Sequence, residues 1–444
     1  NSTCSLSARQ NWAAAQLDQF YLFPETLPAA ANRNPAGFST VNDYVNSLTA
    51  TARAQGRDRF FTFLTSIAEE TAFFESGSNA GFGVRLSIDE AGQRVFISEA
   101  FEGAPALEAG IDRGTEILAI GTTAQNLRTV SAIIAADGTD GISAALGPSD
   151  PGVARRLRIR DAGGTREIGI TKRNYDLLPV SPRYGARVIQ DGNRQIGYIN
   201  LRTFIETADP ALESAFANFR AQGITEFVVD FRYNGGGLLS TANTMGDLLG
   251  RNRSSNDIFA RTVFRASQSS NNSTRRFRSN GSSVAPTRIA FITSQGTASA
   301  SELVINGFLP YLGADIALIG TDTFGKPVGQ IAQDQPACDD RLRIVAFATE
   351  NADGNSDYYD GLAGSVSASC QAGDDVTVQL GDPNEDSIAR ALDYLAGRQC
   401  TPIGGATSQS GSEADQAESL QLRRRTLLMP ARPNPAQIHS PGIF

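Results

Sequence analysis

Lysine and histidine are almost absent from this sequence. Its 39 basic residues include only two lysines, Lys172 and Lys326, so the other 37 are arginines, and its single histidine is His439. A Ser-His-Asp triad has no histidine in the body of the chain, because His439 lies in a polar, proline-bearing terminal segment that we expect to have little order. A zinc site of cysteines and histidines also lacks its usual ligand pattern, since no CxxC pair occurs.

Long apolar runs and an excess of positive charge are missing as well. No run approaches the roughly 18 apolar residues that a membrane-spanning helix needs, so we expect no membrane span. The net charge of -8 and the pI near 5.0 argue against nucleic acid as the main partner. At 444 residues the chain is too long for one ordinary core, which predicts a multidomain protein.

The four cysteines are few and far apart in the sequence. They are Cys4, Cys338, Cys370 and Cys400. An even, widely spaced set fits two disulfides in an oxidising compartment, and we expect Cys338 to pair with Cys370 and Cys4 with Cys400. Four free buried thiols are the alternative. No signal peptide is visible at Asn1, so a periplasmic or otherwise exported location is inferred from the cysteines rather than from a targeting signal.

The pattern of apolar residues divides the chain into four segments. Residues 1–76 have helical spacing, with a capped helix start at Ser39 or Thr40, and predict a small helical bundle. Residues 77–175 carry short alternating strands and predict a β-rich domain. Residues 176–400 alternate strands with helices, which is typical of an α/β core. Residues 401–444 are polar and proline-rich and predict a mobile tail.

Within these segments the individual elements can be placed. An apolar stretch around Phe60, Phe61, Phe63 and Leu64 should complete the N-terminal bundle. The α/β core should contain strands at 195–201, 225–232 and 288–294, helices at 210–223, 238–249 and 300–309, and a solvated loop at 250–286 that includes a short strand at 258–264.

The β-rich segment resembles a PDZ domain. The resemblance rests on GFGVRLSI at 81–88, RVFISEAF at 94–101 and EGAPALEAGIDRGTEILAIG at 102–121. The N–H groups of the turn formed by Gly81, Phe82 and Gly83 can hold a chain-end carboxylate, and the strand that starts at Val84 leaves an edge that a peptide can join. A glycine turn before a strand is also common as plain scaffold, so peptide binding is an expectation from the combined pattern.

Three predicted strand ends of the α/β core carry unusual residues. FRYNGGG at 231–237 provides successive glycines whose N–H groups can converge on an anion at a helix start. In GTASASE, at 296–302, Ser299 lies between a strand and a helix. It is either a helix cap or a nucleophile whose oxyanion the N–H of Ala300 would stabilise. TFGKPVGQ, at 323–330, contains Lys326.

Lys326 is the candidate base because no histidine is available to Ser299. A lysine must lose roughly three units from its ordinary pKa of about 10.4 to be neutral near pH 7, and burial can supply such a shift. Phe324, Pro327 and Val328 offer apolar surroundings. A solvated surface lysine is the alternative, but arginine could not replace a lysine that has to release its proton.

In this order, VVDFRYNGGGLL, GTASASELVINGF and GTDTFGKPVGQ resemble the signature segments of the C-terminal processing (tail-specific) serine peptidases of the S41 family. The resemblance implies a crotonase/ClpP-like α/β peptidase core. It also implies that Ser299 is the nucleophile, Lys326 the general base and Gln330 the residue that orients the lysine. The backbone N–H groups of Gly236 and Ala300 would form the oxyanion hole.

Two departures from the family pattern concern the loops. Tyr233 and Gly235 stand where polar and proline residues are common, and Pro327 stands where glycine is usual. Proline removes an N–H and fixes φ, so the loop around Lys326 could differ in geometry.

The resemblance implies polypeptide substrates, captured through their C-terminal ends by the PDZ-like domain, and no metal or organic cofactor. It leaves open whether a regulatory or adaptor protein is needed and whether the chain forms a homo-oligomer. A catalytically silent or resting peptide-binding scaffold and an acyl-CoA enzyme on a crotonase-like core are the alternative functions. The intact Ser299, Lys326 and Gln330 disfavour the first, and the PDZ-like segment disfavours the second.

Overall fold

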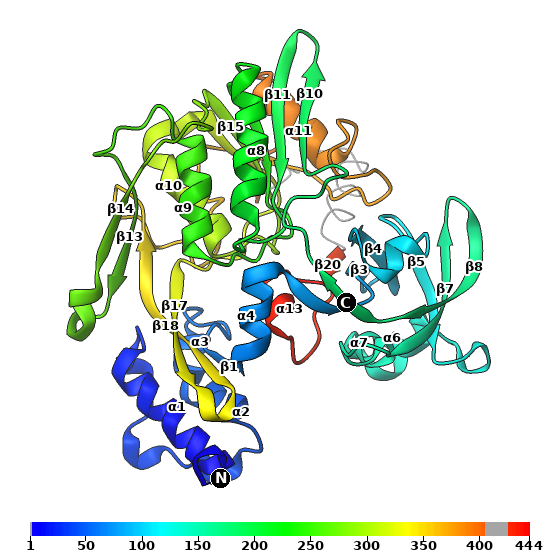
Figure 1. Cartoon of the computed structure of the whole chain (residues 1–444), viewed down its shortest axis with the longest axis vertical. Coiled ribbons are helices and arrows are strands. Elements are labelled where there is room, and N and C mark those ends of the chain that lie inside the picture. Colours follow the sequence, from blue (N-terminus) through cyan, green and yellow to red (C-terminus); the bar gives the residue numbers. More distant parts are fainter. Residues whose placement is uncertain (1, 405–424) are drawn as a thin grey trace.

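The computed structural model describes residues 2–404 and 425–444. Its central element is a six-stranded sheet that is parallel except for its first strand (Figure 1). In spatial order the strands are β10 (Ala186–Asp191), β11 (Arg194–Asn200), β12 (Glu226–Asp230), β15 (Arg288–Thr293), β16 (Ile316–Gly320) and β19 (Ala368–Gln371). The predicted α/β fold class is confirmed, since the chain is a mixed α/β protein with several sheets.

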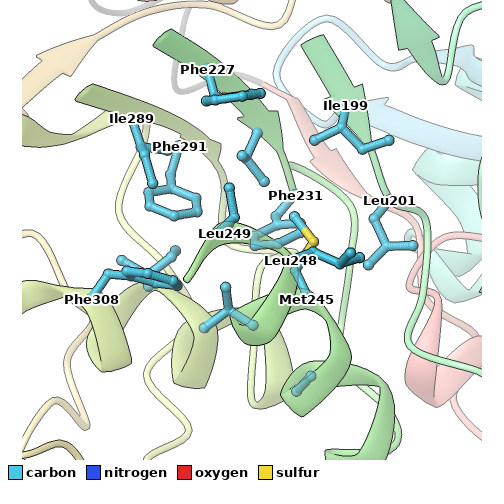
Figure 2. Packing of buried hydrophobic residues seen from close by; sticks show 14 of the residues in the cluster. Ile199, Leu201, Phe227, Phe231, Met245, Leu248, Leu249, Ile289, Phe291 and Phe308 are labelled. Atoms are coloured by element: carbon cyan, nitrogen blue, oxygen red, sulfur yellow. The ribbon is translucent and has the colours of Figure 1, made fainter. Parts of the chain in front are cut away.

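Helices cover both faces of this sheet. One face packs against α8 (Ala208–Ala221), α9 (Leu239–Leu249) and α10 (Ala300–Leu312), and the other packs against α11 (Asp386–Leu395). Figure 2 shows Phe227 of β12, Phe231 just after that strand, Phe291 of β15 and Met245 of α9 in the first of these layers. Successive strand residues point to opposite faces, so strands buried on both sides read as nearly continuous apolar runs. This explains why the sequence pattern located these strands and helices closely.

A second sheet connects the N-terminal segment to the α/β core. Its strands are β1 (Phe63–Ser66), β18 (Asp340–Glu350), β13 (Ile258–Phe264) and β14 (Ser273–Arg276), with β17 (Val328–Gln335) also paired to β18. Helices α1 (Leu6–Phe20) and α2 (Val41–Leu48) share one apolar cluster with β17 and β18. The predicted helix start is confirmed, because Thr40 caps α2 by accepting a hydrogen bond from the N–H of Asp43 (3.0 Å).

One part of the N-terminal prediction was wrong. The apolar stretch around Phe63 and Leu64 is not helical but forms strand β1, which pairs with Arg341 to Arg343 of β18. Pairing with a strand nearly 280 residues away overrides local helical spacing, because the edge of β18 supplies hydrogen bonds that a short helix there would lack.

The predicted disulfide pairing was also wrong, although all four cysteines form disulfides. Cys4 pairs with Cys338, and Cys370 pairs with Cys400. Cys4 ends a short 3-10 helix that lies against the turn between β17 and β18, where Cys338 is located. Spacing in the sequence cannot show this docking of the N-terminal segment, and distance in space decides which cysteines can pair.

Residues 82–172, together with strand β20 from near the end of the sequence, form a separate β-rich unit. Its seven-stranded sheet has the order β20 (Arg425–Leu427), β3 (Val84–Asp89), β4 (Arg94–Ala100), β5 (Glu116–Gly121), β7 (Ala154–Asp161) and β8 (Gly164–Thr171), with β6 (Arg128–Thr129) paired to β5. Helices α5 (Pro105–Glu108), α6 (Val130–Asp137) and α7 (Asp140–Leu146) complete it. Strands β2 (Ser78–Gly81) and β9 (Arg173–Asp176) pair where the chain enters and leaves this unit, which we call the β3–β8 unit.

The end of the chain differs from the expected mobile tail. Of the predicted segment 401–444, residues 405–424 lie outside the described residues. Residues 425–444 are packed into the fold: they supply β20 and α13 (Pro435–His439), and the side chains of Ile443 and Phe444 are buried. Figure 1 shows α13 beside α4 (Ile67–Ser76) and the chain end beside β3 and β4. In the described part of the chain, no helix has both the length and the apolar character required to cross a bilayer.

Candidate active site

Three loops meet at the carboxyl ends of β12, β15 and β16. Because these strands are parallel neighbours, the loops that follow them lie at one edge of the sheet, which is where ligands bind in open α/β sheets. The N–H of Ala298 donates to the carbonyl of Asn234 (3.0 Å), and the N–H of Phe324 donates to the carbonyl of Thr297 (2.9 Å). The structure therefore brings together the three segments that the sequence singled out.

Ser299 lies at the sharp turn into α10. Its backbone has φ 56° and ψ -112°, a conformation that few residues other than glycine adopt. Gly236 faces it closely: a Cβ built on Gly236 would lie 2.9 Å from the Ser299 Cβ and 3.0 Å from the Ala300 nitrogen. Only glycine fits at this position, so the backbone of the 231–237 turn can approach the serine and the start of the helix.

Glu302 ties Ser299 to the loop that carries Lys326. Its fully buried carboxylate accepts hydrogen bonds from the N–H groups of Ser299 (2.8 Å), Gly325 (2.7 Å) and Lys326 (2.8 Å). Burial raises the pKa of this carboxyl, while the hydrogen bonds oppose that shift. The Glu302 side chain thus fixes the backbone of both the Ser299 turn and the loop that contains Lys326.

Lys326 is buried and contacts Gln330, as the family resemblance implies. Its Nζ donates to Gln330 Oε1 (2.9 Å) and lies 4.8 Å from the centre of the Phe61 ring. Burial lowers the pKa of Lys326 to about 8, and the negative charges of Asp58 and Glu302 oppose this shift. A solvated surface lysine is therefore excluded, and Pro327 does not prevent the side chain from reaching Gln330.

The N-terminal segment holds this lysine in place. Gln330 Nε2 donates to the carbonyl of Phe61, and Arg59 donates to the carbonyls of Phe324 (2.5 Å) and Gly325 (2.6 Å). The loop that contains Phe61 is fixed in turn by Asp58, which accepts hydrogen bonds from the Phe61 N–H (2.8 Å) and the Tyr21 hydroxyl (2.7 Å).

Two contacts of a competent Ser-Lys site are not formed here. In residues 2–404 and 425–444, no hydrogen bond joins Lys326 Nζ to Ser299 Oγ, while Lys326 Nζ donates to Gln330 Oε1. The N–H of Gly236, assigned above to the oxyanion hole, donates to Asn234 Oδ1 (2.9 Å). The site residues are assembled around the serine, but the Gly236 N–H has an internal acceptor and the contact between Lys326 and Ser299 is not made.

His439 is ordered and buried, contrary to the expectation of a low-order position. Its Nε2 lies 3.9 Å from Glu70 Oε1, and its ring packs against Phe73 and Phe74. Burial lowers the pKa of His439, and Glu70 opposes that shift. Among the described residues His439 makes no hydrogen bond to Ser299, so the structure provides no Ser-His pair.

The predicted peptide-binding residues lie at the start of β3, and another part of the chain occupies them. The N–H groups of Gly83 (2.9 Å) and Val84 (3.3 Å) donate to the carbonyl oxygen of Phe444. Gly81 is equally close, because a Cβ there would lie 2.7 Å from the carbonyl carbon of Phe444. Phe82 is buried in the core of the β3–β8 unit together with Phe444.

Sequence reasoning missed Glu302, although a signal for it was present. Ser299 and Glu302 have the spacing S-x-x-E, in which a glutamate three residues after the cap reaches back to the backbone N–H of the cap. Phe61, Arg59 and Asn234 gave no such signal, because their roles depend on contacts between distant segments.

Replacing Glu302 with glutamine should lower kcat/KM by roughly 10²-fold, since misplacing catalytic groups by about 1 Å has effects of that size. Glutamine keeps the shape but turns two amide hydrogens toward backbone N–H groups that need an acceptor, so Tm should fall as well. Peptidase kinetics and thermal unfolding check this. Glu75→Gln, at an exposed position of α4, is the matched control and should change neither quantity. Unchanged kinetics in Glu302→Gln would show that the bridge does not position the site.

Comparison with known proteins shows similarity to C-terminal processing proteases. Residues 195–360 match the family described as peptidase family S41. The chain is 28% identical over 254 residues to the carboxyl-terminal-processing protease of Synechocystis sp., an alignment that covers 56% of this chain and 54% of that protein. It is 25% identical over 283 residues to the carboxy-terminal processing protease CtpA of Bacillus subtilis, with 62% and 54% covered. The chain spans about half the length of these curated relatives.

A solved structure shows the same fold over most of the chain. The structure of a Bacteroides fragilis protein provisionally assigned to the S41 proteases superposes with a TM-score of 0.67 at 23% identity, covering 87% of this chain and 97% of that one. The matched segment 195–360 contains Gly236, Ser299, Lys326 and Gln330, the residues that carried the resemblance. Over residues 195–360 the chain is therefore similar to peptidase family S41.

Proposed function

We propose that this protein is a serine endopeptidase that cleaves polypeptides by acyl transfer, with Ser299 as nucleophile and Lys326 as general base. The observation that carries the proposal is the pairing of a strained serine at a helix start with a buried lysine, through the carboxylate of Glu302. Strained backbone conformations are concentrated at functional sites, and so are lysines with a pKa that is lowered by burial.

The reaction follows from the chemistry of these groups. Neutral Lys326 removes the proton of the Ser299 hydroxyl, and Oγ attacks the carbonyl carbon of the scissile peptide bond. The N–H groups of Ala300 and Gly236 donate to the oxygen that becomes negative. The lysine ammonium then gives its proton to the departing amine, and water, deprotonated by the same lysine, hydrolyses the acyl-enzyme.

The arrangement described above is a resting state of this site. Before the first step, Lys326 Nζ must move into contact with Ser299 Oγ, and the Gly236 N–H must exchange Asn234 Oδ1 for the substrate oxygen. The contact of buried Lys326 with Gln330, in a loop that Glu302 ties to the Ser299 turn, favours an active site over a catalytically silent scaffold.

The other parts of the chain have roles that fit this activity. The β3–β8 unit would be a PDZ-like module that binds the C-terminal end of a polypeptide substrate through Gly81 to Val84. The two disulfides fit an exported protein in an oxidising compartment such as the periplasm.

Covalent trapping tests the proposal. The protein is incubated with an unstructured polypeptide and, separately, with a peptide phosphonate that reacts with activated serines, and both reactions are analysed by mass spectrometry. We expect new internal termini in the polypeptide and a single adduct on the fragment that contains Ser299. An intact polypeptide together with an unmodified Ser299 would contradict the proposed activity and favour a binding scaffold.

A further inference from the structure

Residues 442–444 extend the sheet of the β3–β8 unit as an added strand. The Phe444 N–H donates to the carbonyl of Val84 (2.8 Å), the Leu86 N–H donates to the carbonyl of Gly442 (2.8 Å), and Ile443 pairs antiparallel with Arg85. Strand addition to a free sheet edge is a recurring way in which domains bind extended peptides.

The rest of this edge is covered by the same segment of chain. Strand β20 pairs with the second half of β3, where Thr426 lies opposite Ile88, and the Leu428 N–H donates to the carbonyl of Leu86 (3.0 Å). In the described residues β3 therefore has no stretch of free edge that a peptide could join without displacing residues 425–444.

The two last side chains fill apolar pockets on opposite sides of the added strand. Phe444 is 3% exposed and packs into the core of the β3–β8 unit with Phe82 and Leu428. Ile443 is fully buried in the cluster that contains Phe73 and Phe101. Alternate side chains of a bound strand give a peptide site its specificity, so these pockets select apolar residues at both positions.

The same segment touches the turn beside the candidate nucleophile. A Cβ on Gly235 would lie 2.9 Å from Pro441 Cδ and 3.0 Å from the carbonyl oxygen of His439. Arg85 of β3 donates to the carbonyls of both Pro441 and Tyr233. The segment thus runs from the β3 edge to the glycine that precedes Gly236.

We propose that residues 442–444 are an internal ligand of the peptide site on β3, and that this site binds extended polypeptide segments that place apolar side chains in the pockets of Ile443 and Phe444. A substrate segment must displace the internal ligand, and its departure frees the turn at Gly235 and Gly236. The inference rests on the proposed function, in which a substrate binds to the PDZ-like module. It adds which side chains that module accepts and how substrate binding would free the oxyanion donor at Gly236.

Competition with a labelled peptide measures how strongly residues 442–444 occupy the peptide site on β3. All variants carry Ser299→Ala, so binding is read without cleavage, and the probe is a fluorescent ten-residue peptide that ends in Pro-Gly-Ile-Phe with a free carboxylate. A tethered ligand competes at an effective concentration on the order of millimolar. Phe444→Asp places an unpaired carboxylate in an apolar pocket and should release the segment, so the probe should bind at least roughly tenfold more tightly than to the parent.

Two controls make the result specific. Ala431→Asp introduces the same side chain at an exposed position of the same segment and should leave the probe affinity at the parent value. A probe that ends in Pro-Gly-Ile-Asp should bind none of the variants. Equal probe affinity for the parent and a folded Phe444→Asp variant would overturn the proposal.

A second measurement needs no substitution at the chain end. Excess Pro-Gly-Ile-Phe peptide should accelerate hydrogen exchange at the Phe444 N–H, which loses Val84 as acceptor, while the Gly83 and Leu86 N–H groups stay protected by the incoming peptide. Unchanged exchange at Phe444 under saturating peptide would also overturn the proposal. Neither readout depends on catalysis, so a protein that lacked peptidase activity could still pass both tests.

Discussion

Replacing Lys326 with arginine is expected to lower kcat/KM by roughly 10³- to 10⁴-fold, which is the upper range for loss of a general base. Arginine keeps the positive charge and much of the length of the side chain, but it cannot release a proton near neutral pH. Lys326 donates to Gln330 and lies against Phe61, so a guanidinium could keep some of these contacts without acting as a base. Steady-state kinetics with an unstructured polypeptide or a fluorogenic peptide measures the effect.

Lys172 provides the matched control for this substitution. It is the other lysine of the chain, it is buried in the β3–β8 unit, and burial lowers its pKa to about 8 as well. Its Nζ donates only to backbone carbonyls in the described structure, those of Gly147 and Pro148 (both 2.8 Å), and arginine can donate to the same acceptors. Lys172→Arg should therefore keep kcat/KM within a factor of about three of the parent. An equal loss in both variants would mean that the Lys326 effect is not specific to the site.

A stability measurement separates loss of the base from loss of the fold. Burial lowers the pKa of Lys326 to about 8, so protonating it in the folded protein costs roughly 3 kcal/mol relative to the unfolded chain. Near pH 7 the folded protein carries this cost, and the cost disappears as pH rises above the unfolded pKa of about 10.4. Lys326→Met should therefore be inactive yet more stable than the parent at pH 7, with the difference shrinking toward pH 10 in denaturant unfolding.

Replacing Ser299 with alanine is expected to lower kcat by roughly 10⁵- to 10⁶-fold, because removing the nucleophile leaves only binding and the oxyanion donors. The variant should fold normally, since Ser299 Oγ is not needed for the backbone contacts of the turn: Glu302 accepts from the Ser299 N–H, and Asn234 accepts from the Ala298 N–H. Digestion of an unstructured polypeptide, followed over days, has the range to measure so large a loss.

Ser301 is the matched control for the nucleophile. It lies two residues away at the start of α10, and its buried hydroxyl donates to the carbonyl of Asn234 (2.9 Å). Ser301→Ala removes one hydrogen bond to the turn that carries Gly236, and we expect a loss of at most about tenfold, the size that one hydrogen bond contributes. If Ser299→Ala lost no more activity than Ser301→Ala, another residue would have to be the nucleophile.

The sequence identified the parts of the site that depend on local pattern. The parallel strands were visible as apolar runs, and strands of one parallel sheet bring the loops around Asn234, Ser299 and Lys326 to the same edge. Because the sequence has only two lysines and one histidine, it predicted Lys326 as the general base. Its contact with Gln330 came only from the family resemblance, and the structure contains that contact.

Contacts between distant segments could not be predicted in this way. Arg59 and Phe61 reach the lysine loop across more than 260 residues, and nothing in their own neighbourhood marks them. The pairing of Cys4 with Cys338 has the same origin, because it depends on where the N-terminal segment docks.

Contacts between distant segments explain two of the residues that depart from the family pattern, Tyr233 and Gly235. The hydroxyl of Tyr233 accepts a hydrogen bond from Arg113 of the β3–β8 unit (2.9 Å) and donates to Asp374 of the core, so this residue joins the two units. Gly235 lies against Pro441, where a larger residue would collide with the terminal segment. Both positions serve contacts that the three signature segments do not contain.

The pH dependence of Ser299 acylation tests the pairing of a neutral lysine with this serine most directly. The rate of adduct formation with the peptide phosphonate is measured from pH 5 to 10 in the parent and in Lys326→Arg. Because only neutral Lys326 can accept the proton, we predict that the parent rate rises about tenfold per pH unit below its midpoint and levels off above an apparent pKa of about 8, and that Lys326→Arg lacks this rise. A midpoint near 6.5, the ordinary pKa of histidine, or the same profile in both proteins would contradict the assignment of Lys326 as the base.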